Sequence, residues 1–191
     1  FTVREVAEKY GYEPIRYLMI SSHYRAPINY SVEIIEQCRA ALDRLYHCRD
    51  NLRFLMEHAP SGEKPEEEEI RTRMGGYEEK FNAFMDDDLN TDDALSVLFD
   101  FAKDINTSLN ADTAPSKELC GFALEHFMKL ADVLGLLYTE KKDDTQDEEI
   151  EKLIAERTAA RKAKNWAEAD RIRDELKARH VVLEDTPQGV K

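Results

Sequence analysis

The sequence predicts a mainly α-helical protein, in which an antiparallel helical bundle is followed by a small α+β domain with a short β-hairpin. Three observations support this fold class. Charged residues make up 35% of the 191 positions, which is typical of helices with a solvent-facing side. Only seven glycines and six prolines interrupt the chain, and its apolar residues recur mostly at helical spacing. With 42% hydrophobic residues, the chain can also build a core.

Two short helices are expected before residue 30. The first begins with a capping box, because the Thr2 hydroxyl can accept from the third helical amide while Glu5 reaches back to the cap. Gly11 ends this helix. A second helix should end near Ser22, and Pro27 then breaks the helical pattern.

Four longer helices should form the bundle. The second of them begins in the acidic segment 59–69, since acids favour a helix N-terminus, and it has a weak point at Gly75-Gly76. Short loops between such helices favour antiparallel packing. The other three have polar residues as expected caps: Ser31, then Asn90 or Thr91, then Ser116.

The last part of the chain combines two helices with a hairpin. Residues 139–149 are charged and lack apolar anchors, which predicts a linker that merges into a helix start. This helix reaches about Lys164, and a second capping box, formed by Asn165 and Glu168, starts the next helix. The pattern then changes to VVLED and TPQG, a short strand and a turn, and a return strand begins at Val190.

Charge is unevenly distributed along the chain, whose formal net charge is −13. Residues 59–150 carry 24 acidic and 9 basic side chains, whereas residues 1–58 are balanced with 8 of each and residues 151–191 carry 10 basic and 8 acidic. A nucleic-acid surface is therefore expected in the flanks. No apolar run has the length of a membrane span, and no signal peptide is recognisable, so we expect a cytoplasmic protein without a membrane partner.

Two segments raise the question of metal or catalytic chemistry. The acidic run at 85–93 lacks the glycine and the closing glutamate of a calcium loop, so helix capping is the favoured interpretation. His23 has no partner spaced to complete a catalytic set. Three cysteines show no metal-ligand spacing. We therefore expect neither a catalytic residue nor a metal site, while Tyr24 and Arg25 are candidate contacts to RNA or a partner, with plain packing as the alternative.

The segment ARKAKNWAEADRIRDEL is the strongest candidate site. Arg161, Lys162 and Lys164 cluster at the end of one helix. Trp166 begins the next helix, and Asp170 shares its face. An exposed ring can stack on an unpaired base while Arg and Asp bond to base edges. The competing interpretation is structural, because cations complement a helix C-terminus and tryptophan more often packs in a core.

Three segments resemble cysteinyl-tRNA synthetases. FTVREV and YEPIRYLMISSHYRAPINYS, followed by CRAALDRLY, resemble the region after the KMSKS loop. FMDDDLNTDDALSVLFDFAKDIN resembles the helical-bundle segment of that family. ARKAKNWAEADRIRDEL with VVLEDTPQGV resembles its anticodon-binding domain. The similarity covers nearly the whole chain in the family's order.

The resemblance implies a class I ligase that activates cysteine with ATP and attaches it to tRNA(Cys). Its catalytic domain, with the ATP and zinc sites, would lie upstream of Phe1, so this chain would be inactive alone and would need no cofactor. The implied partners are tRNA(Cys) and the enzyme's own catalytic domain, and a monomer is expected. The implied domains are a stem-contact region at 1–30, a helical bundle at 31–138, a linker at 139–146 and an anticodon-binding domain at 147–191 with a truncated end.

The family's anticodon-contacting positions match Arg161, Trp166, Asp170 and Asp185. By resemblance, Trp166 would stack on a base of the GCA anticodon and the other three would bond to base edges. The chain departs from the family at two places: His180 stands where the family often has glycine, and the tryptophan and basic tail that the family has after Val190-Lys191 are absent. The resemblance therefore does not imply a closed hairpin, or the full affinity for the RNA backbone. Two alternatives remain: a helical interaction module without RNA binding, and a synthetase-like ligase that joins cysteine to an amino-sugar, whose relatives lack the anticodon domain.

Overall fold

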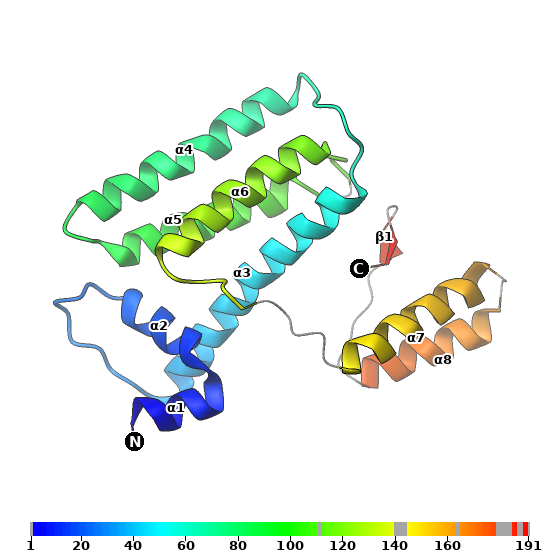
Figure 1. Cartoon of the computed structure of the whole chain (residues 1–191), viewed down its shortest axis with the longest axis horizontal. Helices are drawn as coiled ribbons and strands as arrows, with labels where there is room; N and C mark the ends of the chain where they lie inside the picture. The colour runs from blue at the N-terminus through cyan, green and yellow to red at the C-terminus, as the bar shows by residue number, and fades with distance from the viewer. Residues whose placement is uncertain are drawn as a thin grey trace. The chain divides into compact units, whose positions relative to one another are not determined.

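The chain forms two compact units, Phe1–Tyr138 and Thr139–Lys191, in the computed structural model (Figure 1). The structure describes residues 2–110, 112–139, 145–162, 165–178, 185–186 and 189–190. Each unit buries apolar side chains of its own. Within the described ranges, no helix is both long and apolar enough to cross a membrane.

Four helices of the first unit, α1, α3, α5 and α6, begin where the sequence places their caps. Thr2, Ser31, Asn90 and Ser116 each accept a hydrogen bond from the backbone amide three residues later, which confirms these caps. The acidic run at 85–93 therefore does contribute a helix cap. The bounds are α1 (Val3–Tyr10), α2 (Tyr12–Ile20), α3 (Val32–His58), α4 (Glu67–Asp86), α5 (Thr91–Ser108) and α6 (Lys117–Val133).

The expected weak point at Gly75-Gly76 does not interrupt α4. A Cβ atom added at Gly75 would lie 3.8 Å from the Phe122 ring on α6, so the missing side chain leaves room for close packing of the two helices. Glycine costs about 1 kcal/mol in a helix interior relative to alanine, and tertiary packing routinely outweighs a cost of this size.

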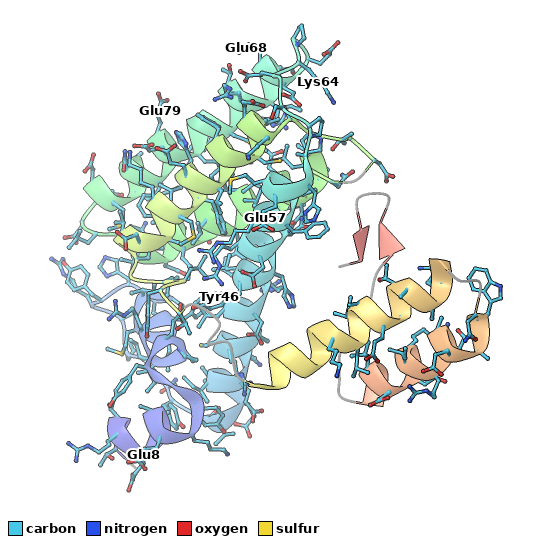
Figure 2. The ribbon with its side chains drawn as sticks, turned by 45° about the vertical axis from the view of Figure 1, so that its right-hand side comes forward. Glu8, Tyr46, Glu57, Lys64, Glu68 and Glu79 are labelled. Atoms are coloured by element: carbon cyan, nitrogen blue, oxygen red, sulfur yellow. The ribbon has the colours of Figure 1, made fainter. Side chains whose placement is uncertain are left out.

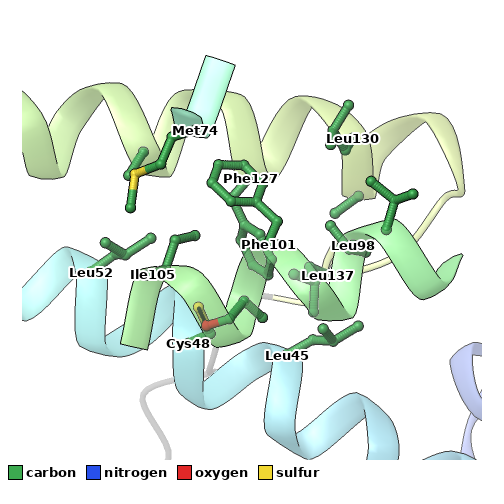
Figure 3. Close-up of a cluster of buried hydrophobic side chains, with 14 of the residues drawn as sticks. Leu45, Cys48, Leu52, Met74, Leu98, Phe101, Ile105, Phe127, Leu130 and Leu137 are labelled. Carbon is green, nitrogen blue, oxygen red and sulfur yellow. Dashed lines mark hydrogen bonds between the residues drawn. The ribbon is translucent and has the colours of Figure 1, made fainter. Parts of the chain in front are cut away.

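Helices α3, α4, α5 and α6 pack around one apolar core (Figures 1 and 3). Its centre is aromatic: the Phe101 ring stacks on Tyr77 at 4.7 Å and meets the edge of Phe127 at 5.9 Å. Offset and edge-to-face ring pairs add to the free energy gained from apolar burial. The helical part of the predicted fold is confirmed. Fully buried aliphatic and sulfur-containing residues surround the rings: Leu45, Leu52, Met74, Leu98 and Ile105.

A buried polar cluster fastens the last residues of the first unit. Leu137 has a left-handed backbone (φ 60°), which is strained for a residue with a side chain. Its N–H donates to Glu13 Oε1 at 2.6 Å, and its carbonyl accepts from Arg49 Nη1 at 3.3 Å. The same Glu13 carboxylate accepts from the Tyr46 hydroxyl at 2.7 Å. We call Glu13, Tyr46, Arg49 and Leu137 the end clamp, because they join α2 and α3 to the segment that follows α6.

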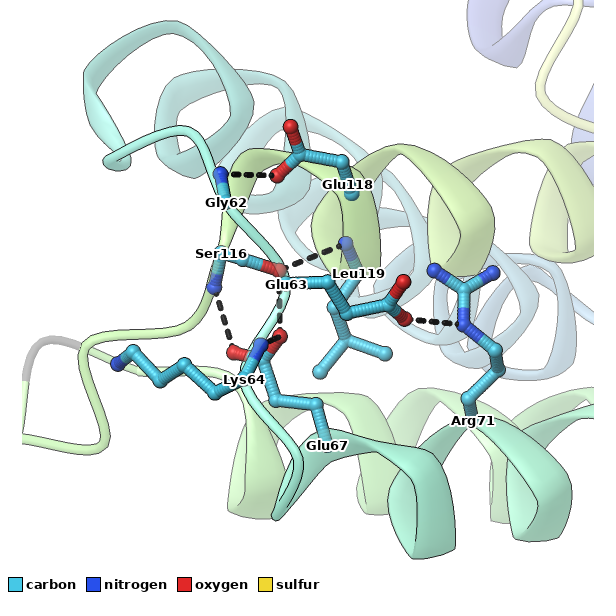
Figure 4. A network of polar contacts seen from close by, with 8 residues as sticks. All are labelled: Gly62, Glu63, Lys64, Glu67, Arg71, Ser116, Glu118 and Leu119. Carbon is cyan, nitrogen blue, oxygen red and sulfur yellow. Dashed lines mark hydrogen bonds and ion pairs between the residues drawn. The ribbon is translucent and has the colours of Figure 1, made fainter.

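A second buried carboxylate joins α4 to α6 (Figure 4). Glu67 is 5% exposed and accepts from the backbone N–H and the hydroxyl of Ser116, the residue that caps α6. It also accepts from the Lys64 N–H at 3.2 Å. Burial opposes ionisation of this carboxyl, but the bonds from Ser116 and Lys64 outweigh it, so the pKa of Glu67 lies below its ordinary value.

The second unit contains a helical hairpin. Helices α7 (Thr145–Lys162) and α8 (Trp166–Ala178) pack along each other (Figure 1), and α8 buries Ala169, Ile172 and Leu176. Of the expected β-hairpin, the described residues contain only a minimal antiparallel ladder between β1 (Asp185–Thr186) and β2 (Gly189–Val190). The remainder of the expected strand, 181–184, lies outside the described residues.

Replacing Glu67 by Gln should lower the free energy of unfolding by about 1–3 kcal/mol, because an amide cannot accept all three of these bonds. Since the pKa of Glu67 is lowered in the folded chain, its stabilisation is present above the unfolded pKa of about 4.3 and is lost as pH falls through the lower folded value. The variant should therefore lose less stability on acidification. Urea titrations between pH 7 and pH 3 measure both effects. Glu79→Gln, an exposed glutamate of the same helix beyond its first turn (Figure 2), is the control and should change neither quantity.

Replacing Glu13 by Ala should also cost about 1–3 kcal/mol, since the Leu137 N–H and the Tyr46 hydroxyl both lose their acceptor. Thermal unfolding followed by circular dichroism measures the loss. Glu8→Ala, on the exposed side of α1 (Figure 2), is the matched control. Equal melting temperatures for the two variants would contradict the role given to the end clamp.

Candidate nucleic-acid interface

Asn165 joins α7 to α8 and ends one helix while capping the next. Its backbone N–H donates to the Ala160 carbonyl at 2.8 Å, and its side-chain oxygen accepts from the Glu168 N–H at 3.4 Å. The predicted break between the helices is confirmed. The predicted capping box is only half formed, because the Asn165 N–H is taken by Ala160 and the Glu168 carboxylate binds the Arg171 guanidinium at 2.7 Å.

Trp166 is the first residue of α8, and its side chain is 60% exposed. The buried face of α8 is formed by Ala169, Ile172 and Leu176, so the ring lies off the core face. The alternative of a packed core tryptophan is therefore wrong. A single exposed apolar side chain is common on protein surfaces, so the exposure of Trp166 leaves its ring accessible to a partner without by itself requiring one.

Asp170 follows Trp166 by one helical turn on the same face of α8. Its carboxylate is exposed and forms an ion pair of 3.1 Å with Arg173, which is also exposed. An exposed pair of this kind contributes little stability and is readily exchanged for another partner. Arg161 lies in the last turn of α7 and is exposed. The two helix ends that meet at Asn165 thus carry the guanidinium of Arg161, the exposed indole ring of Trp166 and the carboxylate of Asp170.

The side chains of three predicted site residues are not among those that the structure describes. Lys164 lies outside the described residues, as do the side chains of Lys162 and Asp185. The backbone of Asp185 pairs with Val190 in the short ladder. The roles of these three residues stay predictions.

Tyr24 and Arg25 lie in a second exposed cluster, within the first unit. The Tyr24 hydroxyl donates to Asp88 Oδ1 at 2.9 Å, and the bond to this carboxylate raises the pKa of Tyr24. Arg25 Nη2 and His23 Nε2 approach Asp88 Oδ2 at 3.5 and 3.8 Å. The His23 and Tyr24 rings stack at 4.6 Å. Sequence reasoning missed Asp88 as the shared partner, because 64 residues separate it from Tyr24 and no local pattern links them.

A metal site and a reactive thiol each have requirements that can be compared with the described residues. Among them, no group of three or more His, Cys, Asp or Glu side chains could hold a metal ion. The cysteines Cys38, Cys48 and Cys120 are buried thiols. Burial raises the pKa of Cys120 to about 11, so this thiol stays protonated at neutral pH.

Comparison with known protein families gives two matches in sequence order. Residues 80–138 match the DALR domain, and residues 143–191 match the cysteinyl-tRNA ligase anticodon-binding domain. The first match covers the end of α4 together with α5 and α6, and the second contains the corner at Asn165. These two successive domains identify the chain as the C-terminal portion of a cysteinyl-tRNA synthetase.

Proposed function

We propose that this chain is the tRNA-recognising part of cysteine–tRNA ligase, and that it binds tRNA(Cys) for the attachment of cysteine. We assign the stem contact to residues 1–30, the bundle to 31–138, a linker to 139–146, whose last two residues already belong to α7, and anticodon reading to 147–191. The two matched domains are non-catalytic, so cysteine activation, ATP and zinc belong to the catalytic domain of the enzyme. We expect the enzyme to act in the cytoplasm as a monomer.

The exposed ring of Trp166 is the observation that carries this proposal. It lies within the segment that matches the anticodon-binding domain, and among the described residues of α8 the buried face is formed by others. The bases of an anticodon loop can be splayed apart and stacked on aromatic side chains. Stacking of a base on an aromatic ring contributes about 1–3 kcal/mol to binding. Trp166 is therefore the proposed platform for one anticodon base.

The charged residues around Trp166 have the donors and acceptors that a GCA anticodon requires. An arginine can donate two bonds to a guanine edge, which suits Arg161. Cytosine and adenine present amino donors, and carboxylates accept from such groups, which suits Asp170 and Asp185. Lys162 and Lys164 are proposed to bond to the RNA backbone. Phosphate repulsion disfavours carboxylates on an RNA surface, so a role in base recognition explains their presence there.

Tyr24 and Arg25 are proposed to contact the inner side of the folded tRNA. Arg25 has 70% of its side chain exposed, and its distance of 3.5 Å to Asp88 indicates a weak pair. A phosphate can take the place of such a carboxylate on a guanidinium. This contact would add affinity without sequence preference.

The two alternatives differ in what they predict for RNA. An interaction module without RNA binding predicts no affinity for tRNA(Cys) at all. A cysteine:amino-sugar ligase has no use for an anticodon-binding domain, and the match over residues 143–191 favours the synthetase. A binding titration with tRNA(Cys) and with an anticodon-substituted tRNA tests the proposal, and equal affinities would contradict anticodon reading.

Replacing Trp166 by Ala should weaken binding of tRNA(Cys) by about 1–3 kcal/mol, because the base loses its stacking platform. Replacing it by Phe should restore part of this free energy, since an aromatic face remains. Electrophoretic mobility shifts at fixed salt concentration measure both variants. An Ala variant that binds as tightly as the parent chain would refute the stacking role.

Replacing Asp170 by Asn should reduce discrimination at one anticodon base by about 1–3 kcal/mol and leave the other positions unchanged. The measurement compares affinities for a set of tRNAs, each substituted at a single anticodon position. Asp174→Asn is the matched control, because Asp174 lies on the same helix with 73% of its side chain exposed. A similar loss for both variants would indicate a general charge effect instead of base recognition.

A further inference from the structure

Two grooves adjoin along the outer face of α5 and share the residues Asp100, Lys103 and Thr107. The first lies against α3 and is also lined by Arg44, Phe99 and Asn106. The second lies against α4 and is also lined by Arg73, Tyr77, Lys80 and Asp104. We call them together the α5 grooves. Both belong to the first unit, whereas the proposed anticodon corner belongs to the second.

Basic side chains dominate the α5 grooves. Arg73 donates two bonds of 2.9 Å to Asp104, so these two residues neutralise each other. Arg44 lies over the Phe99 ring and Lys80 over the Tyr77 ring, each at 5.1 Å from the ring centre. Lys103 is exposed between the two grooves. Three cations, Arg44, Lys80 and Lys103, therefore face a single further carboxylate, that of Asp100.

Two of these cations, Lys80 and Lys103, lie in the most acidic part of the chain. Residues 59–150 carry 24 acidic and 9 basic side chains. Elsewhere on this segment Arg71 pairs with Glu63 and Lys129 with Glu78. Within the part of the chain that the structure describes, Lys80 and Lys103 have no carboxylate within ion-pair distance. Two free ammonium groups are thus gathered at one place on an acidic surface.

We infer that the α5 grooves bind the phosphate backbone of the same tRNA whose anticodon the second unit reads. Lysine carries a compact positive charge on a flexible aliphatic chain. It can therefore bind a phosphate as a point charge, without the fixed bidentate geometry of arginine. Asn106 and Thr107 add amide and hydroxyl donors of the kind that contact phosphate oxygens. The inference rests on the proposed function for the identity of the RNA, and it assigns to this surface affinity without sequence preference.

The test is a salt titration of tRNA binding by the whole 191-residue chain carrying Lys80→Gln and Lys103→Gln together. Affinity should fall by the same factor for tRNA(Cys) and for an anticodon-substituted tRNA. The slope of log affinity against log salt concentration should become less steep by roughly 1–2, since each phosphate contact contributes about 0.7–0.9. Lys117→Gln is the control, because Lys117 is an exposed lysine of the same acidic segment outside the grooves, and it should change neither quantity.

Asp100→Asn provides a second variant that misfolding cannot imitate. Removing the last carboxylate that opposes these three cations should tighten binding of both tRNAs. Wild-type affinity and salt slope in the double lysine variant would overturn the inference. The grooves would then be better explained as a binding surface for an acidic protein. Loss of binding in the double lysine variant, together with unchanged binding in Trp166→Ala, would instead support RNA binding by the grooves and contradict anticodon reading.

Discussion

The packing of the first unit depends on the hydrogen bonds that fix its last residues to α2 and α3. Leu134, Leu136 and Leu137 are buried in the core, yet Leu137 has a strained left-handed backbone. Such a conformation persists only where its surroundings determine it more than once. Here the buried Glu13 carboxylate accepts a hydrogen bond from the Leu137 N–H, and the buried Arg49 guanidinium donates one to the Leu137 carbonyl. Because Glu13 comes from α2 and Arg49 from α3, the same contacts join the N-terminal helices to the bundle and fix where the chain leaves it.

Carboxylates have two different roles in this acidic chain, and burial separates them. Glu13 and Glu67 are buried, accept several bonds each and join helices, so removing one leaves buried donors unsatisfied. Asp88 and Asp170 are exposed and hold tyrosine or arginine side chains in weak contacts. Exposed pairs cost little to separate. The exposed carboxylates can therefore release their partners to RNA, or bond to a base themselves, without loss of the fold.

Local features were predictable from the sequence, and long-range ones were not. The caps at Thr2, Ser31, Asn90 and Ser116 depend on residues three positions apart, so the printed order is enough to place them. The corner at Asn165 follows from the same local rule. In contrast, the contact between Glu13 and Leu137 spans 124 positions, and the α5 grooves combine residues of three helices. Hydrophobic periodicity indicates which face of a helix is buried, but not which polar groups meet across it.

Trp166 is proposed to stack on an anticodon base, and the chain contains its own reporter of this contact. Trp166 is the single tryptophan of the sequence, so intrinsic indole fluorescence monitors this ring alone. An RNA stem–loop that carries the GCA anticodon should change the emission in step with its binding, which is followed in parallel through the anisotropy of a labelled RNA. A loop with substituted anticodon bases should bind more weakly and change the emission less. Binding of the GCA stem–loop without any change in Trp166 emission would contradict the account.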